Sequence, residues 1–121
     1  MLTDSEVQRL LDIANAGVQK GLIAQARRVY EGILVNRPEH VPTLISLAMS
    51  QMAVGEYAEA EATLREKVLT DHPEDADALA YLGLNAFLAG RPDEARGILE
   101  QVPAGTTAGT MAQNLLEKIN G

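Results

Sequence analysis

The sequence has no cysteine and no tryptophan, and aromatic residues make up only 3% of its 121 residues. The lack of cysteine excludes disulfides, cysteine-based zinc sites and cysteine nucleophiles, and it fits a reducing compartment. No uninterrupted apolar run approaches the roughly 18 residues of a membrane span, so we expect no membrane-spanning helix. Acidic residues stand near the start, at Asp4 and Glu6, where a signal peptide would carry positive charge. We therefore expect a cytoplasmic protein.

Basic residues are also scarce. Ten lysines and arginines against seventeen acidic residues give a net charge of −7 and an isoelectric point near 4.7. Proteins that bind nucleic acid neutralise phosphates with clustered Lys and Arg, which this chain does not offer, so we expect no nucleic-acid partner. Its length suits one domain that buries about two-thirds of the surface of the unfolded chain.

The composition favours helices. Hydrophobic residues make up 46% of the chain, and alanine and leucine are the most prominent of them. These two residues rank highest in helix propensity, whereas the aromatic residues that strands prefer are rare here. The composition therefore predicts an all-α protein.

Three segments of the chain repeat one pattern. Each has a glycine, an alanine five residues later and a large side chain four residues after that, and successive glycines are 34 and 35 residues apart. A small residue lies seven positions before each glycine. We interpret each unit as a helical hairpin in which the glycine ends the first helix and the small residues lie where the two helices cross. The three matching sets are Gly21–Ala26–Tyr30, Gly55–Ala60–Leu64 and Gly90–Ala95–Leu99, preceded by Ala14, Ala48 and Gly83.

This pattern resembles the tetratricopeptide repeat (TPR), whose unit is about 34 residues long. The third unit matches it best, and the second has one residue inserted before Pro73. The matching residues of the third unit are Leu79, Leu82, Gly83, Ala86, Ala95 and Leu99. The resemblance implies an all-α fold, a right-handed superhelix of three TPR hairpins at about 7–40, 41–75 and 76–109. A C-terminal capping helix at about 108–120 completes a single TPR domain over residues 1–121.

The two ends of the solenoid have their own local patterns. Thr3 and Glu6 have the spacing of a capping box that opens the first helix. Residues 103–110 read as a flexible stretch before the last helix. This stretch is either a simple connector or a hinge that lets the last helix shift.

No catalytic or cofactor-binding pattern is present. His40 and His72 lie in the predicted connectors, without other residues at metal-ligand spacing. The glycines are spaced as helix ends and not as a phosphate-binding loop. We therefore expect no enzyme activity, no cofactor and no metal.

The first helix of each unit carries a second apolar stripe. In the middle unit Ile45, Met49 and Met52 follow the spacing i, i+4, i+7, on a face rotated by about 100° from the stripe that packs inside the hairpin. Part of this stripe can instead belong to the core between repeats, and both interpretations stay open. In TPR proteins this face lines the concave groove, so the resemblance implies a largely apolar groove. The predicted groove residues are Leu11, Asn15, Val18, Ile45, Met49, Met52, Leu84, Phe87 and Leu88.

An apolar, methionine-containing groove suits an amphipathic helix of a partner protein. Two runs, SLAMSQMAVGEYAEA and ALAYLGLNAFLAG, most resemble the small TPR-like chaperones of the bacterial type III secretion needle subunit. That resemblance implies a groove that holds a helix of the needle subunit, keeping it soluble and monomeric before export, with a small helical co-chaperone in the complex. The alternatives are a generic TPR adaptor or assembly module, or a self-associating scaffold such as a homodimer.

Overall fold

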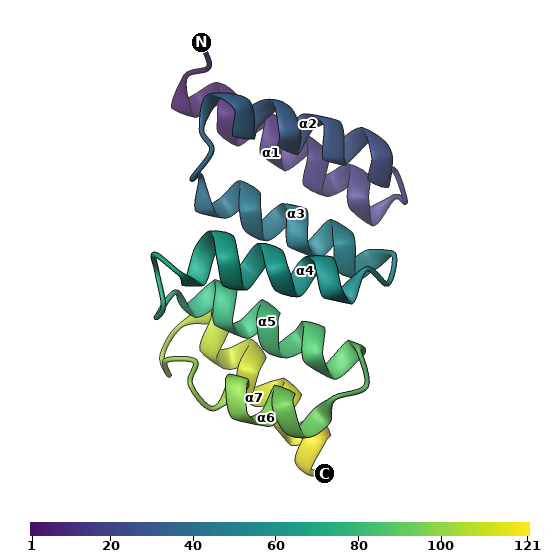
Figure 1. Ribbon diagram of the computed structural model, residues 1–121, viewed down its shortest axis with the longest axis vertical. Coiled ribbons are helices and arrows are strands. Elements are labelled where there is room, and N and C mark those ends of the chain that lie inside the picture. Colours follow the sequence, from purple (N-terminus) through teal and green to yellow (C-terminus); the bar gives the residue numbers. More distant parts are fainter.

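The computed structural model describes residues 1–121 as an all-helical chain without strands, which confirms the predicted fold class (Figure 1). The helices are α1 (Asp4–Gln19), α2 (Ile23–Asn36), α3 (Val41–Ala53), α4 (Tyr57–Leu64), α5 (Ala76–Leu88), α6 (Pro92–Leu99) and α7 (Thr107–Asn120). A π-helical turn, η1 (Arg65–Leu69), continues α4. None of these helices combines the length and the apolar character needed to cross a membrane.

The helices form three antiparallel hairpins stacked along the long axis of the molecule (Figure 1). Each hairpin pairs consecutive helices: α1 with α2, α3 with α4, and α5 with α6. The second helix of one hairpin packs against the first helix of the next, and α7 packs on α5 and α6. The first helices also touch one another, α1 with α3 and α3 with α5, so that they form one continuous side of the stack.

Glycines end the first helices as the spacing predicts. Gly21, Gly55 and Gly90 have φ angles of +83°, +79° and +82°, which is the left-handed region that favours glycine. The first helix also begins as predicted, because Glu6 N donates to Thr3 Oγ1 at 3.2 Å and Thr3 N donates to Glu6 Oε1 at 2.9 Å.

The core is divided at the junction between the first and second hairpins. Six buried residues, including Tyr30 and Ile33, form a cluster inside the first hairpin, and a larger cluster runs through the other two hairpins and α7. A polar bridge spans the junction. The Arg27 guanidinium donates to Ser50 Oγ and Ser50 O, each at 3.2 Å, and pairs with Glu56 at 2.6 Å. The first hairpin is therefore held to the second by charge-assisted hydrogen bonds as well as apolar packing.

The residue inserted in the second repeat is accommodated by the π turn η1. A π turn takes up one extra residue without breaking the helix. Val68, inside this turn, remains completely buried. The turn therefore keeps the inward face of the second repeat in register despite the longer spacing.

The sequence-based prediction of a flexible stretch over residues 103–110 is wrong for its second half. Thr106 caps α7 by accepting a hydrogen bond from Gly109 N at 2.8 Å, and the helix begins at Thr107. Gly109 is buried, and a Cβ added there would lie 2.5 Å from Pro103 O. The start of α7 is thus packed tightly against the connector, because a threonine cap and a glycine allow that close approach.

No repeat within residues 1–121 packs on the outer side of the first hairpin. Ile13 is 62% exposed. Its counterparts in the other two hairpins are covered, since Leu47 packs against the core cluster of the first hairpin and Leu82 is buried in the larger cluster. Leu22 is 45% exposed beside it, and with Val29 these residues line a small apolar depression. We call Ile13, Leu22 and Val29 the first-hairpin face.

Candidate protein-binding groove

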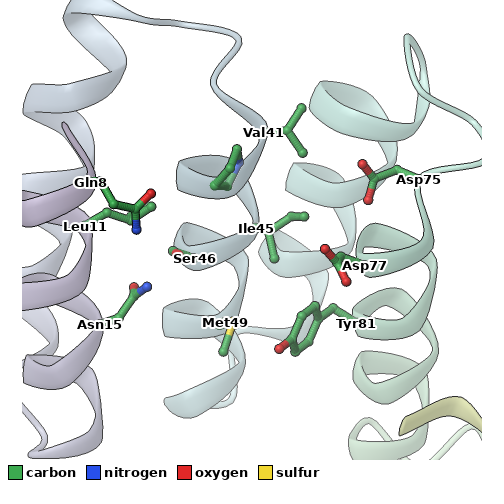
Figure 2. Close-up of a pocket in the computed structure, with 11 residues that line it drawn as sticks. Gln8, Leu11, Asn15, Val41, Ile45, Ser46, Met49, Asp75, Asp77 and Tyr81 are labelled. Atoms are coloured by element: carbon green, nitrogen blue, oxygen red, sulfur yellow. The ribbon is translucent and has the colours of Figure 1, made fainter. Parts of the chain in front are cut away.

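The side formed by α1, α3 and α5 is hollowed into a concavity of about 550 Å³, which we call the central groove (Figure 2). Side chains from all three helices point toward this space (Figure 2). It is lined by Gln8, Leu11, Asn15, Val41, Pro42, Ile45, Ser46, Met49, Asp75, Asp77 and Tyr81. The lining is mixed, with apolar side chains in the middle and two carboxylates at one edge.

A second concavity of about 220 Å³ continues the central groove toward the ends of α3 and α5. Its lining is entirely hydrophobic, and it shares Met49 and Tyr81 with the central groove. We call it the apolar end, and it is lined by Met49, Met52, Ala53, Tyr81, Leu84 and Leu88. Met49 is 39% exposed and Leu88 is 46% exposed, which leaves apolar surface open to a partner.

Asn15 is fixed in position by the core of the first hairpin. The Tyr30 hydroxyl donates to Asn15 Oδ1 at 2.5 Å. Burial raises the pKa of Tyr30, so its hydroxyl stays protonated and remains a donor. Asn15 lies, with Val18 and Met49, beside a further small concavity at the α1 side of the groove.

The structure gathers all of the predicted groove residues except Phe87 along these concavities. Leu11, Ile45 and Met52 are buried and form the floor, with exposures of 3%, 8% and 6%. These three residues therefore also belong to the core, which was the second of the two interpretations of this stripe. Phe87 does not line the groove; it is half-buried and packs against the core cluster.

Tyr81, Asp75 and Asp77 line the central groove but were missed in the sequence. The repeat spacing contains a signal for one of them, since Gln8, Pro42 and Asp77 occupy equivalent positions of the three units and all line this groove. Asp75 precedes α5 as its N-cap and accepts a hydrogen bond from Ala78 N at 2.9 Å. Asp75 lies outside the helical repeat pattern, because it precedes α5 as the N-cap, and the spacing of groove residues within the helices therefore did not include it.

No cluster of three or more His, Asp or Glu side chains is arranged to hold a metal ion. His40 lies in the connector before α3, as predicted, but it is half-buried at the N-cap position and its Nδ1 lies 2.7 Å from Thr43 Oγ1. Burial, reinforced by the nearby Arg37 charge and opposed by Asp4, lowers the pKa of His40 below 6.5. These contacts tie His40 to the start of a helix and not to the groove.

Comparison with known proteins agrees with the repeat pattern. No curated protein sequence matches the chain. Among solved structures, the type III secretion translocator chaperone SycD of Yersinia enterocolitica superposes with a TM-score of 0.76 and 17% sequence identity, over 99% of this chain and 87% of that one. At this identity the likeness concerns the fold.

The sequence model of the tetratricopeptide repeat matches residues 45–108, which is more than half of the chain. The tetratricopeptide repeat is a protein-interaction fold. The chain belongs to the tetratricopeptide repeat family.

Proposed function

We propose that the protein is a chaperone that captures an amphipathic helix of a partner protein in the central groove and its apolar end. The observation that carries this proposal is the wholly apolar lining of the apolar end, with Met49 and Leu88 exposed on the groove side of a TPR fold. Helix-in-groove binding uses this kind of surface, and methionine adapts to different partner shapes.

The energetics require a partner that fills more than the apolar end. Covering an exposed apolar side chain contributes about 1.5 kcal/mol, and association costs about 4–15 kcal/mol in lost freedom. Met49, Leu84 and Leu88 alone contribute about 4.5 kcal/mol, which matches only the lower end of that cost. A partner helix that also contacts the central groove can offset more of it, which favours one long apolar face over a short hydrophobic anchor.

The client that we propose is the needle subunit of a type III secretion system, held soluble and monomeric in the cytoplasm before export, with a small helical co-chaperone in the complex. Two observations support this client. Residues 46–60 resemble the corresponding run of needle-subunit chaperones, and the fold is shared with a type III secretion translocator chaperone. That neighbour favours a translocator subunit as the second client class. In either case residues 1–121 act together as a single domain of three repeats and a capping helix.

Co-expression with a needle subunit tests this proposal. We expect a soluble complex by size-exclusion chromatography with light scattering, and we expect Met49→Glu with Leu84→Glu to abolish it, because charges then replace apolar contacts in the groove. The control is Ala24→Glu with Val35→Glu, which adds the same charge at exposed apolar positions of α2, outside the groove and outside the first-hairpin face. Circular dichroism confirms that both variants fold.

An unchanged complex in the groove variant contradicts the groove assignment. If the needle subunit does not bind and a translocator subunit does, the second client class is correct. Binding of neither supports the role of a general TPR adaptor or assembly module.

Self-association is a second candidate, favoured by the first-hairpin face. Ile13 is exposed, whereas its counterparts Leu47 and Leu82 are covered by the preceding repeat, and Leu22 lies exposed beside it. Two copies that join these faces bury apolar surface on both sides. Sedimentation equilibrium tests this, and we expect a homodimer that Ile13→Glu with Leu22→Glu converts to a monomer. A wild-type monomer at 100-fold the working concentration contradicts it.

A further inference from the structure

The groove is not chemically uniform along its length. Asp75 and Asp77 lie at the edge where α5 begins, with Val41 across from them at the start of α3 (Figure 2). Met52 and Leu88 lie at the opposite edge, where α3 and α5 end. A partner helix in this groove therefore has a carboxylate pair near one end and apolar side chains near the other.

The two carboxylates are not neutralised within the chain. No Lys or Arg lines the central groove, and neither aspartate takes part in an ion pair. Asp75 uses one oxygen for the Ala78 amide, and exposed Asp77 accepts no hydrogen bond. By contrast, Asp4 and Asp93, in the first turns of α1 and α6, are both paired with arginines. The negative charge at the groove edge is thus available to a ligand.

We propose that the partner helix carries Lys or Arg at one end of its apolar face, and that Asp75 and Asp77 bind this basic end and so set the direction of the helix in the groove. This inference rests on the proposed function, because it concerns the same groove. Charge complementarity of this kind contributes to specificity and register more than to affinity. A helix with the same apolar face but no basic end still binds, more weakly and in either direction.

The spacing gives the partner a definite pattern. Asp77 and Leu88 are eleven residues apart on α5, which corresponds to about 16 Å at 1.5 Å per residue. A partner helix lying along α5 therefore needs its basic residues about three turns from its last apolar anchor. A needle-type or translocator-type client sequence can be searched for this arrangement.

The test uses two synthetic amphipathic helices with the same leucine face. One ends in two lysines placed three turns from the last leucine, and the other has two glutamines there. Fluorescence anisotropy measures the affinity of each peptide for the full chain at low and at physiological salt. We expect the lysine peptide to bind about three- to tenfold more tightly at low salt, with a smaller preference at higher salt.

The decisive variant is Asp75→Asn with Asp77→Asn. Asparagine is as good an N-cap as aspartate, so the start of α5 is preserved. We expect this variant to lose the preference for the lysine peptide and to bind the glutamine peptide as the wild type does. The control, Glu31→Gln with Glu117→Gln, removes two exposed charges on α2 and α7 that take part in no ion pair, so its net charge changes equally. It should keep the preference.

Each outcome has one meaning. Comparing two peptides across two proteins cancels any difference in the helicity of the free peptides. Equal binding of both peptides by the wild type overturns the inference, as does a preference that survives in the aspartate variant or disappears in the control. If binding is equal but Met49→Glu with Leu84→Glu abolishes it, the groove function stands without the inference. If neither peptide binds, both are overturned.

Discussion

The side chain of Leu99 on α6 fills the space beside Gly83 on α5, so closely that a Cβ at position 83 would lie 2.6 Å from Leu99 Cγ. Both residues are buried, and Leu99 is only 1% exposed. This contact sets how near the two helices of the third hairpin approach. Because tightly packed interiors accommodate an added methyl group only by shifting, a methyl group at position 83 would displace Leu99 or move the two helices apart.

Gly83→Ala is therefore expected to destabilise the protein, although alanine is the better helix former. Overpacking a core costs about 1–3 kcal/mol, which outweighs the roughly 0.5–1 kcal/mol that alanine gains over glycine in a helix. Urea unfolding followed by circular dichroism measures the change. An unchanged or higher midpoint contradicts this close approach.

Gly97→Ala and Gly32→Ala are expected to have the opposite effect. Both glycines lie inside helices, α6 and α2, and a Cβ at either would meet no atom within 4 Å. Each replacement should raise the free energy of unfolding by about 0.5–1 kcal/mol, because it lowers the entropy of the unfolded chain and improves helix propensity. The same urea titration serves here. Loss of stability in both variants would contradict this prediction, because it would show that other residues pack against these two positions.

Arg27→Ala is expected to weaken the junction between the first two hairpins. The variant removes two hydrogen bonds to Ser50 and the ion pair with Glu56, and we expect a loss of about 1–2 kcal/mol in unfolding free energy. Arg28→Ala is the matched control, since Arg28 is exposed and takes part in no ion pair. Hydrogen exchange should show faster exchange of amides in α1 and α2 in the Arg27 variant only. Equal effects of the two substitutions would contradict the bridge.

His40 is expected to make the protein less stable at mildly acidic pH. Because its pKa is lowered in the folded state, the unfolded chain binds the proton more readily. Stability from this group is complete above pH about 6.5 and is lost as the pH falls through the lower folded pKa. His40→Asn places a residue that is favoured at N-caps in this position and removes the titration, so the unfolding free energy of the variant should change less between pH 7.5 and 5.5. If the unfolding free energies of the wild type and the His40→Asn variant depend identically on pH, the prediction is wrong.

Leu88 and Phe87 are adjacent but should behave differently. Leu88→Ala removes an exposed contact from the apolar end and should weaken binding of the lysine peptide about tenfold with little effect on stability. Phe87→Ala should instead lower the free energy of unfolding by about 1–3 kcal/mol, because Phe87 packs against the core, while the folded variant binds normally. Calorimetric titration and urea unfolding separate the two effects. A larger binding loss for Phe87→Ala would place Phe87 in the groove.

Features that depend on local sequence were predictable. The glycines 34 and 35 residues apart, the Thr3 capping box and the small residues at the crossings all follow from helix geometry over a few turns. The extra residue of the second repeat was visible as an insertion before Pro73, and only its absorption into a π turn needed the structure.

The exact lining of the groove was not predictable in the same way. Val18, Met52 and Phe87 are equivalent in the repeat, yet only the first two line concavities, and α5 contributes Leu88 instead. Which neighbouring residue faces the groove depends on how each hairpin is rotated against the next, and side-chain packing between repeats sets that rotation. Asp77 was missed for a different reason, since neither of its counterparts, Gln8 and Pro42, carries a charge.

The two ends of the stack differ in what they offer to another molecule. The exposed side chains of α7 are polar, among them Gln113, Asn114, Glu117 and Lys118, whereas the first-hairpin face is apolar. Head-to-tail stacking would have to set these unlike surfaces against each other, and repeated addition of that kind produces open filaments. Contact through two first-hairpin faces closes on itself with a two-fold axis and ends at a pair. We therefore expect the polar last helix to limit the proposed self-association through the first-hairpin face to a pair.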